Sequence, residues 1–221
     1  MCGFIGGFWS RPGSPSKTLF SSALSSLVHR GPDDKGTFFS SMPNGVLGLG
    51  HQRLSIIDLS TSGRQPMESS DGRYSMVFNG EIYNYKELAH KYNYSLSTGS
   101  DCEIILHLFK ELGIRKTIDQ LDGVFMFTIY DETNDILYAG RDPMGVRPGF
   151  IANDGDETFI SSEAKSLIKF SKPNNCGVFF NDLIIEIIYF NLFSFIEISK
   201  PSIENSLLKN ARRDIFVLIF S

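Results

Sequence analysis

The sequence predicts an α+β domain over roughly residues 2–172, in which helices pack on the outside of antiparallel sheets. Short segments rich in β-branched and aromatic residues alternate with turn residues, which is typical of hairpins. The nearly continuous apolar run 124–130 indicates a central strand that is covered on both faces. Two longer stretches carry apolar residues at a spacing of four, which favours helices.

The first half of the chain should begin with a buried strand around Phe4 and Ile5, followed by a helix over 17–29. Leucine, alanine and phenylalanine side chains recur four residues apart in that stretch, and Gly31-Pro32 ends it. Strands are then expected at 37–39, 46–50 and 74–78, separated by turns at 43–45 and 70–72.

The second half should contain two more helices before the central hairpin. A short helix is expected over 85–92 and a longer one over 101–112, capped by Ser100 or Asp101 and ended by Gly113. The strand 124–130 should pair with 136–140, and a strand at 158–161 and a helix at 163–170 should close the domain.

The tail 173–221 has a different character. It is rich in Phe, Ile, Leu, Asn and Ser without a clear period, so we expect an atypical segment that is poorly packed or not native to the domain. The stretch 178–198 is apolar enough to raise a membrane span as an alternative. Asp182, Glu186 and Glu197 lie inside it, and charges at the centre of a bilayer are costly, which argues against a span.

Composition excludes several classes of function. The net charge is −4 and the isoelectric point is near 5.6, so no basic surface for nucleic acid is expected. The three cysteines, Cys2, Cys102 and Cys176, show no paired spacing, which predicts a reducing, cytoplasmic compartment without structural disulfides. No metal-binding motif is present, and no metal site is expected.

Cys2 is the strongest candidate nucleophile, because removal of Met1 would leave a thiol and a free α-amine on one residue. A free α-amine titrates near pH 8, about one unit above neutrality, so a useful fraction is neutral and accepts the thiol proton. Position alone is weak evidence, since a second-position cysteine is ordinarily incidental. Its weight comes from motifs further along the chain.

Six stretches in a fixed order carry a family resemblance. They are CGFIGG at 2–7, HRGPDD at 29–34, GHQRLSIID at 50–58, FNGEIYN at 78–84, SDCE at 100–103 and RDPMGVRP at 141–148. Together they resemble the class II glutamine amidotransferase domain, the glutaminase half of glutamine-hydrolysing asparagine synthetase. The same glutaminase domain, here called the head, occurs in other amidotransferases, although these motifs look most like the asparagine synthetase type.

The resemblance implies an N-terminal nucleophile hydrolase fold, a four-layer αββα sandwich of two antiparallel sheets. It also implies that Cys2 attacks the side-chain amide of glutamine and forms a γ-glutamyl thioester with release of ammonia. The Asn79 side chain and the Gly80 N–H match the family's donors to the oxyanion. Taken alone, Asn-Gly is more typical of a hairpin turn.

The resemblance also assigns the residues that hold the amino acid. Arg53 matches the partner of the α-carboxylate, which a guanidinium binds through two parallel hydrogen bonds. Glu81 and Asp101 match the ammonium ligands, and backbone groups around Ile56 complete the site. The alternatives are a solvated surface arginine and a helix cap at Asp101.

Other polar residues near these motifs have structural interpretations. His29 and His51 are expected to be structural, since the α-amine already supplies a base. Arg30 should shape a loop over the site, and Cys102 and Cys176 should only pack.

In asparagine synthetase the ammonia passes to a second domain that adenylates aspartate. Neither its Ser-Gly-Gly-Leu-Asp-Ser loop nor the closing strands of the head are recognisable here, so we expect a truncated head with open sheet edges. No cofactor is expected for this chain, and ATP and Mg²⁺ are expected only for the synthetase domain. The head would release ammonia to a separate synthetase domain or protein. The alternatives are an inactive fragment or interaction module, and a membrane-anchored amidotransferase.

Overall fold

The computed structural model describes residues 1–9, 17–42, 45–56, 58–153 and 157–170, and the backbone of four further strands between Cys176 and Leu218. The helices are α1 (Lys17–Ser25), α2 (Tyr85–Lys91), α3 (Glu103–Gln120) and α4 (Ala164–Leu167), with short 3-10 turns η1 (Val28–Arg30) and η2 (Thr61–Gly63). The strands are β1 (Gly3–Trp9), β2 (Asp34–Met42), β3 (Gly45–Arg53), β4 (Met67–Glu68), β5 (Tyr74–Ile82), β6 (Gly123–Asp131), β7 (Ile136–Arg141), β8 (Phe150–Asn153), β9 (Glu157–Ser161), β10 (Cys176–Val178), β11 (Ile184–Phe190), β12 (Phe193–Ser199) and β13 (Phe216–Leu218).

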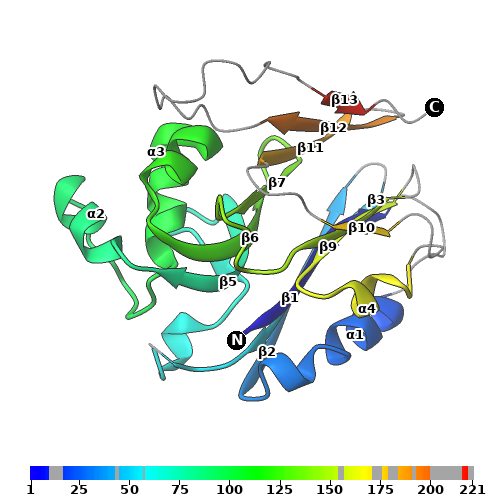
Figure 1. The fold of residues 1–221 in the computed structure, drawn as a ribbon, viewed down its shortest axis with the longest axis horizontal. Coiled ribbons are helices and arrows are strands. Elements are labelled where there is room, and N and C mark those ends of the chain that lie inside the picture. The colour runs from blue at the N-terminus through cyan, green and yellow to red at the C-terminus, as the bar shows by residue number, and fades with distance from the viewer. Residues whose placement is uncertain are drawn as a thin grey trace.

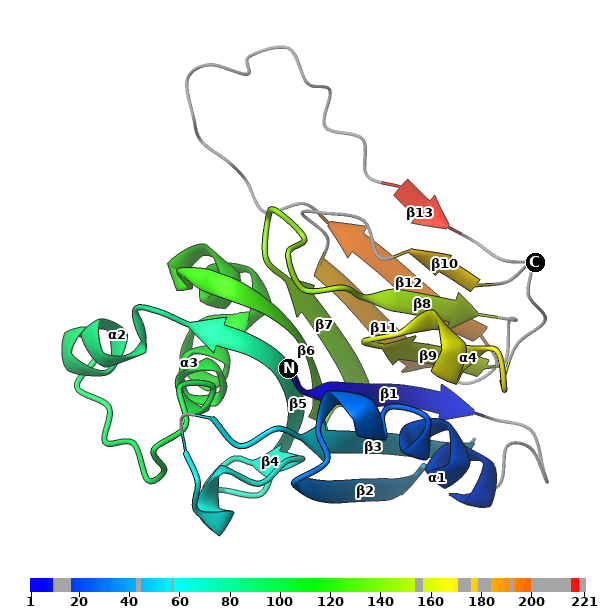
Figure 2. The same cartoon turned by 60° about the horizontal axis from the view of Figure 1, so that its bottom comes forward.

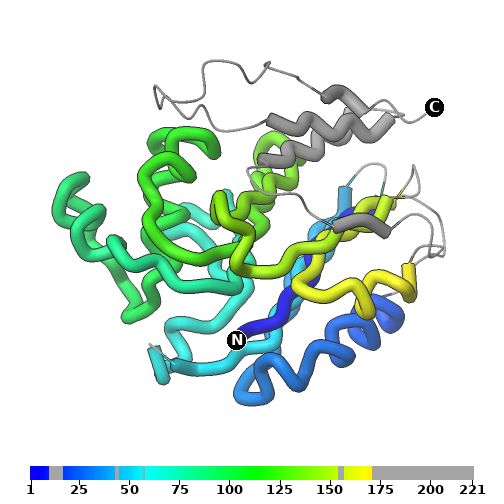
Figure 3. The backbone as a smooth tube through the Cα atoms, in the orientation of Figure 1, coloured from blue at the N-terminus to red at the C-terminus, as the bar shows by residue number. Residues whose placement is uncertain are grey.

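Two antiparallel sheets form the centre of the molecule (Figures 1 and 2). The first has the strand order β10-β8-β9-β1-β3-β2, and the second has the order β13-β12-β11-β7-β6-β5-β4. Helices α1 and α4, the first and last of the chain, pack side by side near the first sheet, whereas α2 and α3 lie beside the second (Figure 3). The arrangement confirms the predicted α+β sandwich.

Three hydrophobic clusters separate the four layers. One lies between the second sheet and α2 and α3, one lies between the two sheets, and one lies between the first sheet and α1 and α4. The central strand β6 shows why both of its faces are apolar. Phe125, Phe127 and Ile129 enter the cluster beneath α3, while Met126 and Tyr130 enter the cluster between the sheets. Strand alternation therefore explains the unbroken apolar run that the sequence shows.

Most predicted elements are confirmed, with three helices differing in extent. The closing helix predicted at 163–170 is only the four-residue α4. The predicted helix 17–29 is α1 followed by the separate turn η1. The predicted helix 101–112 begins only at Glu103, and it resumes after a break at Gly113 to reach Gln120. Its N-cap is Cys102, whose side chain makes no capping hydrogen bond. The predicted cap at Ser100 or Asp101 is therefore wrong.

The tail forms strands that were not expected. The backbone of β11 pairs with β7 and with β12, and β10 pairs with β8. The prediction of open sheet edges is therefore wrong at β7 and β8. The segment considered as a membrane span contains β11 and most of β12. Among the described residues, no helix is both long and apolar enough to cross a bilayer.

Candidate active site

A cavity of about 130 Å³ opens beside the start of β1, where the N-terminus lies next to β5 (Figure 2). Residues from five separate parts of the chain line it: Met1, Cys2, Arg53, Leu54, Ile56, Asp58, Gly63, Gln65, Phe78, Asn79, Gly80, Glu81, Ser100, Asp101 and Arg147. All seven residues that the sequence assigned to catalysis or substrate binding are among them. The fold thus brings together motifs that are up to 145 positions apart, from Cys2 to Arg147.

Cys2 is held at the point where β1 meets the end of β3. The two strands pair in antiparallel register with Gly3 opposite Gln52, which places the Cys2 Sγ 3.4 Å from the backbone nitrogen of Leu54. Burial raises the pKa of the Cys2 thiol above its ordinary value of 9.0. The Leu54 hydrogen bond and the positive charges of the chain terminus, Arg53 and Arg30 act in the opposite direction.

Strand β5 presents two hydrogen-bond donors to the cavity. The amides of Phe78 and Ile82 point away from β6, since they donate to the Gln65 Oε1 and the Asp101 Oδ2 at 2.6 Å each. Because amide direction alternates along a strand, the Gly80 N–H between them points to the same edge, into the cavity. Within the described structure the buried Asn79 Nδ2 has no hydrogen-bond partner. A buried donor without a partner is costly, which suggests that a ligand satisfies it.

The interpretation of Asn79-Gly80 as a hairpin turn is wrong, because both residues lie within the nine-residue strand β5. A Cβ on Gly80 would lie 2.3 Å from the Val124 carbonyl oxygen of the neighbouring strand. Glycine is therefore required here by close backbone approach, not by a turn.

Arg53 is almost fully buried at the end of β3, so the alternative of a solvated surface arginine is wrong. Its guanidinium donates to the Ser60 carbonyl at 2.7 Å and to the Asp58 carbonyl. The Asp58 carboxylate in turn accepts from the Gly99 amide at 3.1 Å. Arg53 therefore holds the loop after β3 against the segment that carries Asp101.

The two predicted ammonium ligands have different environments. Asp101 is buried, and this burial raises the pKa of its carboxyl, while the hydrogen bond from Ile82 opposes the effect. Glu81 is exposed at the cavity mouth, as is Ile56, whose side chain is 70% exposed. A ligand entering the cavity would therefore meet one enclosed and one open carboxylate.

Neither of the two histidines lines the cavity, in line with the structural roles predicted for them. His51 is fully buried and bonds the Phe78 carbonyl at 3.0 Å through Nε2, and burial lowers its pKa to about 4. His29 contacts the Glu163 carboxylate at 2.9 Å. Arg30 lies closer to the nucleophile than predicted, since its Nε donates to the Cys2 carbonyl at 2.9 Å.

The sequence analysis missed Gln65, which fixes β5 through its hydrogen bond to Phe78, and Arg147 at the cavity wall. Arg147 belongs to the motif RDPMGVRP at 141–148, so its presence in the site could have been predicted. Gln65 lies outside all six motifs, and nothing in its neighbourhood signals a role.

Comparison with known proteins identifies the family. The model of the glutamine amidotransferase domain matches residues 1–182. A putative glutamine-hydrolysing asparagine synthetase of Methanocaldococcus jannaschii is 38% identical over 162 residues, covering 67% of this chain and 31% of that protein. Asparagine synthetase B of Escherichia coli is 37% identical over 172 residues, covering 76% of this chain and 30% of that protein.

The fold is also that of a solved amidotransferase. Glutamine phosphoribosylpyrophosphate amidotransferase from Bacillus subtilis superimposes with a TM-score of 0.70 at 20% identity, covering 91% of this chain and 50% of that one. The chain spans about a third of the length of the asparagine synthetases that it matches. On the evidence of the family model and these alignments, the chain belongs to the glutamine amidotransferase domain family.

Proposed function

We propose that the chain hydrolyses the side-chain amide of glutamine, with Cys2 as the nucleophile. The observation that carries this proposal is the cavity in which the Cys2 thiol and two open donors on β5, Asn79 Nδ2 and Gly80 N–H, converge. A thiol beside preorganised donors is the arrangement that acyl transfer needs, because negative charge develops on the carbonyl oxygen as the thiol adds.

The reaction begins once Met1 has been removed and the Cys2 α-amine is free. The amine takes the thiol proton, and the sulfur adds to the amide carbon to give a tetrahedral oxyanion beside Asn79 and Gly80. Collapse breaks the C–N bond, and the amine returns the proton so that ammonia leaves. Water then adds to the γ-glutamyl thioester and the C–S bond breaks, which releases glutamate and regenerates the free thiol. No redox partner or cofactor enters this sequence.

Arg53 and Asp101 would bind the amino-acid end of the substrate. Within the described part of the chain, Arg53 uses two of its five N–H donors on the loop carbonyls of Asp58 and Ser60, which leaves others for the α-carboxylate. Asp101 and Glu81 would receive the α-ammonium group. A bound ammonium favours the ionised carboxylate, so glutamine should lower the raised pKa of Asp101.

The test is glutamate release from glutamine by the purified chain, with intact mass recorded to establish loss of Met1. We expect release by the wild-type chain and none by Cys2→Ala. Cys2→Ser is the matched control, because it keeps the size of the side chain but is a far weaker nucleophile at neutral pH. A Met1-processed, folded wild-type chain that releases no glutamate would overturn the proposal.

We further infer that the ammonia is destined for ATP-dependent asparagine synthesis from aspartate on a separate synthetase domain or protein in the cytoplasm. The support is the similarity to glutamine-hydrolysing asparagine synthetases, of which this chain matches only the part described above. ATP and Mg²⁺ would bind to that partner. Mixing the chain with candidate synthetase domains, ATP and aspartate, and measuring glutamine-dependent asparagine, tests this assignment.

A further inference from the structure

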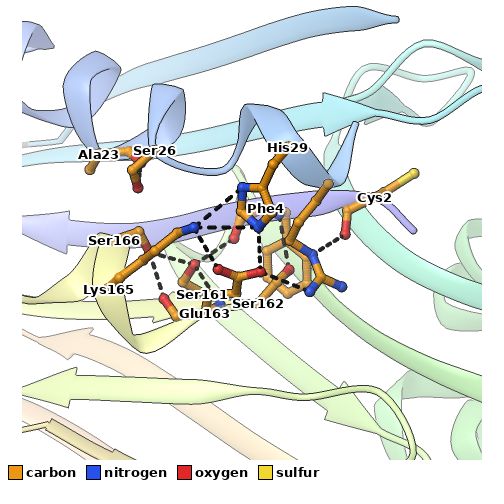
Figure 4. A network of polar contacts seen from close by, with 11 residues as sticks. Cys2, Phe4, Ala23, Ser26, His29, Ser161, Ser162, Glu163, Lys165 and Ser166 are labelled. Carbon is orange, nitrogen blue, oxygen red and sulfur yellow. Dashed lines mark hydrogen bonds and ion pairs between the residues drawn. The ribbon is translucent and has the colours of Figure 1, made fainter. Parts of the chain in front are cut away.

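A polar network at the end of β9 reaches the strand that carries the nucleophile (Figure 4). It is formed by the consecutive residues Ser161, Ser162 and Glu163, which lie 157 to 161 positions after Phe4 and Cys2 in the chain. None of the six motifs includes them, and none of them lines the active-site cavity. Their contacts are nevertheless directed at the first residues of β1.

The two serines fix the backbone of Phe4. The Phe4 amide donates to the Ser162 Oγ at 3.0 Å, and the Phe4 carbonyl accepts from the Ser161 Oγ at 2.8 Å and from the Ser162 amide at 3.1 Å. All three residues are buried, where such bonds are not exchanged readily with water. β1 is therefore locked two residues after Cys2.

Glu163 continues this contact to Cys2 itself through Arg30. The Glu163 Oε1 accepts from the Arg30 Nη1 at 3.0 Å, and the Arg30 Nε donates to the Cys2 carbonyl at 2.9 Å. His29 and Lys165 hold the same carboxylate at 2.9 and 3.0 Å. Figure 4 shows the Glu163 carboxylate at the centre of these contacts, with Cys2 at one end.

We propose that Glu163 is a positioning residue that orients Cys2 by holding the Arg30 guanidinium against the Cys2 carbonyl. The proposal rests on the glutaminase function proposed above. The directions of the Cys2 thiol and of its future α-amine depend on rotation about the backbone and side-chain bonds of Cys2. A hydrogen bond that fixes the Cys2 carbonyl restricts rotation about the Cα–C bond. Arg30 and Glu163 thereby act on the orientation of the nucleophile without touching substrate.

The charges explain why Arg30 depends on Glu163. The Arg30 side chain is 9% exposed, and its Nη2 is buried without a partner in the described structure. A buried cation that loses its counter-ion is strongly destabilised and moves to find water. Burial alone would raise the pKa of Glu163, but hydrogen bonds from Arg30, Lys165 and His29 outweigh it and lower the pKa to about 2. The carboxylate therefore stays charged at any pH at which glutamine hydrolysis would be measured.

The test combines two single variants and their double variant, Glu163→Gln, Arg30→Met and both together. Glutamine hydrolysis and alkylation of Cys2 by iodoacetamide are measured for each on the full, Met1-processed chain. We expect Glu163→Gln to lower kcat at least tenfold, to change KM less than about twofold, and to slow alkylation at neutral pH. The double variant should be no worse than Arg30→Met alone, because residues that act through one contact are not additive.

Two further variants separate positioning from loss of stability. Asp131→Asn removes an almost fully buried carboxylate that, like Glu163, pairs with an arginine, since the Asp131 Oδ2 lies 2.7 Å from the Arg73 Nη2. Neither Asp131 nor Arg73 lines the cavity, so we expect a lower melting temperature with unchanged kcat. Glu163→Asp keeps the charge and should recover part of the activity that Glu163→Gln loses.

The outcomes are distinguishable. Wild-type kcat and alkylation in a folded Glu163→Gln variant would overturn the positioning role, as would fully additive effects of Glu163→Gln and Arg30→Met. A wild-type chain without glutaminase activity would overturn the proposed function instead. In that case the alkylation rates of the four proteins still decide whether Glu163 and Arg30 act on Cys2 together.

Discussion

Asn79 carries the clearest sign of function in a single side chain. Its amide nitrogen lies buried in the wall of the cavity without a partner in the described structure, although buried amides normally donate. Asn84, the last residue of the same motif and five positions after Asn79, has a side-chain amide whose nitrogen and oxygen are both hydrogen-bonded. It donates to the Gln120 carbonyl at 2.9 Å and accepts from the Asp122 amide at 3.1 Å. One asparagine is free for a ligand, and the other joins two segments.

Replacing each asparagine by alanine should therefore give opposite results. Asn79→Ala should lower kcat for glutamine hydrolysis by about 10²- to 10³-fold, as expected for one lost oxyanion donor. Its free energy of unfolding should change by less than about 1 kcal/mol, because the Nδ2 makes no bond in the described structure. Asn84→Ala should lose about 1 to 2 kcal/mol and keep its kcat. Steady-state kinetics and urea unfolding of both variants measure these effects. A stability loss in Asn79→Ala and a loss of kcat in Asn84→Ala would contradict the assignment of Asn79 as an oxyanion donor.

His51 makes stability depend on pH. Burial lowers its pKa to about 4 in the folded chain, compared with 6.5 when exposed. The unfolded state therefore binds more protons between these values, and stability falls as the pH falls through that window. The loss from this one group between pH 7 and pH 5 should be about 2 kcal/mol.

Urea unfolding at a series of pH values measures this loss. His51→Gln is the matched variant, because glutamine keeps a donor for the Phe78 carbonyl but does not titrate. Its stability should vary less between pH 7 and pH 5 than that of the wild-type chain by about the same 2 kcal/mol. Equal slopes in the two proteins would show that other groups cause the dependence.

At the scale of elements, periodicity was sufficient wherever a strand or helix buries one regular face. The pattern before Gly113 was assigned correctly for this reason, and the run 124–130 because it is apolar on both faces. The short strands β4 and β8 were not predicted, because two to four residues carry too little pattern and their pairing is decided by distant neighbours. Similarly, α1 ends before the predicted residue 29 because the amides that follow it, at Ser26 and Leu27, donate to carbonyls three residues back. The spacing of apolar residues does not distinguish this tighter turn from a continuing α-helix.

Gly113, which the sequence predicted to end a helix, interrupts α3 instead, and the helix resumes after it. Its φ of 75° and ψ of 171° belong to a region that side chains other than glycine rarely adopt. A Cβ there would meet no atom within 4 Å, so strain comes from the backbone alone. Gly113→Ala should therefore cost about 1 to 3 kcal/mol of unfolding free energy.

The control is Lys116→Ala, an exposed position in the same helix, where alanine should change stability by no more than about 0.5 kcal/mol. Thermal unfolding followed by circular dichroism is a sufficient measurement. Neither residue lines the cavity, so glutamine hydrolysis at 25 °C should be unchanged in both folded variants. A Gly113→Ala chain as stable as the wild type would mean that the break moves or closes.

At the scale of the whole molecule, motifs predicted which residues meet but not what holds them in place. The sequence identified all seven assigned residues that line the cavity. It did not reveal that Arg30 holds the Cys2 carbonyl or that Gln65 holds β5, because each contact depends on where the fold places a residue outside the strands, 28 and 13 positions from its partner. Cys2 immediately precedes β1 of the first sheet, whereas Asn79 and Gly80 lie in β5 of the second. The distance between nucleophile and oxyanion donors is thus set by the packing of sheet on sheet.

The two sheets lie close together at Gly6 of β1. A Cβ on Gly6 would lie 2.8 Å from the Thr128 Oγ1 of β6 and 3.0 Å from the Leu49 Cδ2. Thr128 is fully buried, and its hydroxyl has no partner in the described structure. Gly6→Ala should therefore push β1 away from β6 and cost about 1 to 3 kcal/mol, as overpacking of a core does. It should also lower kcat, because the shift moves Cys2 relative to Asn79.

The double variant Gly6→Ala/Thr128→Ala tests that cause directly. Thr128→Ala removes the oxygen that the new Cβ would strike, and since that oxygen makes no hydrogen bond in the described structure, the single variant should lose little stability. The double variant should then recover part of both the stability and the kcat that Gly6→Ala loses, giving a coupling energy of about 1 kcal/mol in a double-mutant cycle. Strictly additive losses would mean that Gly6 matters for its backbone alone. Recovery of stability without recovery of kcat would mean that sheet spacing does not set the geometry of the site.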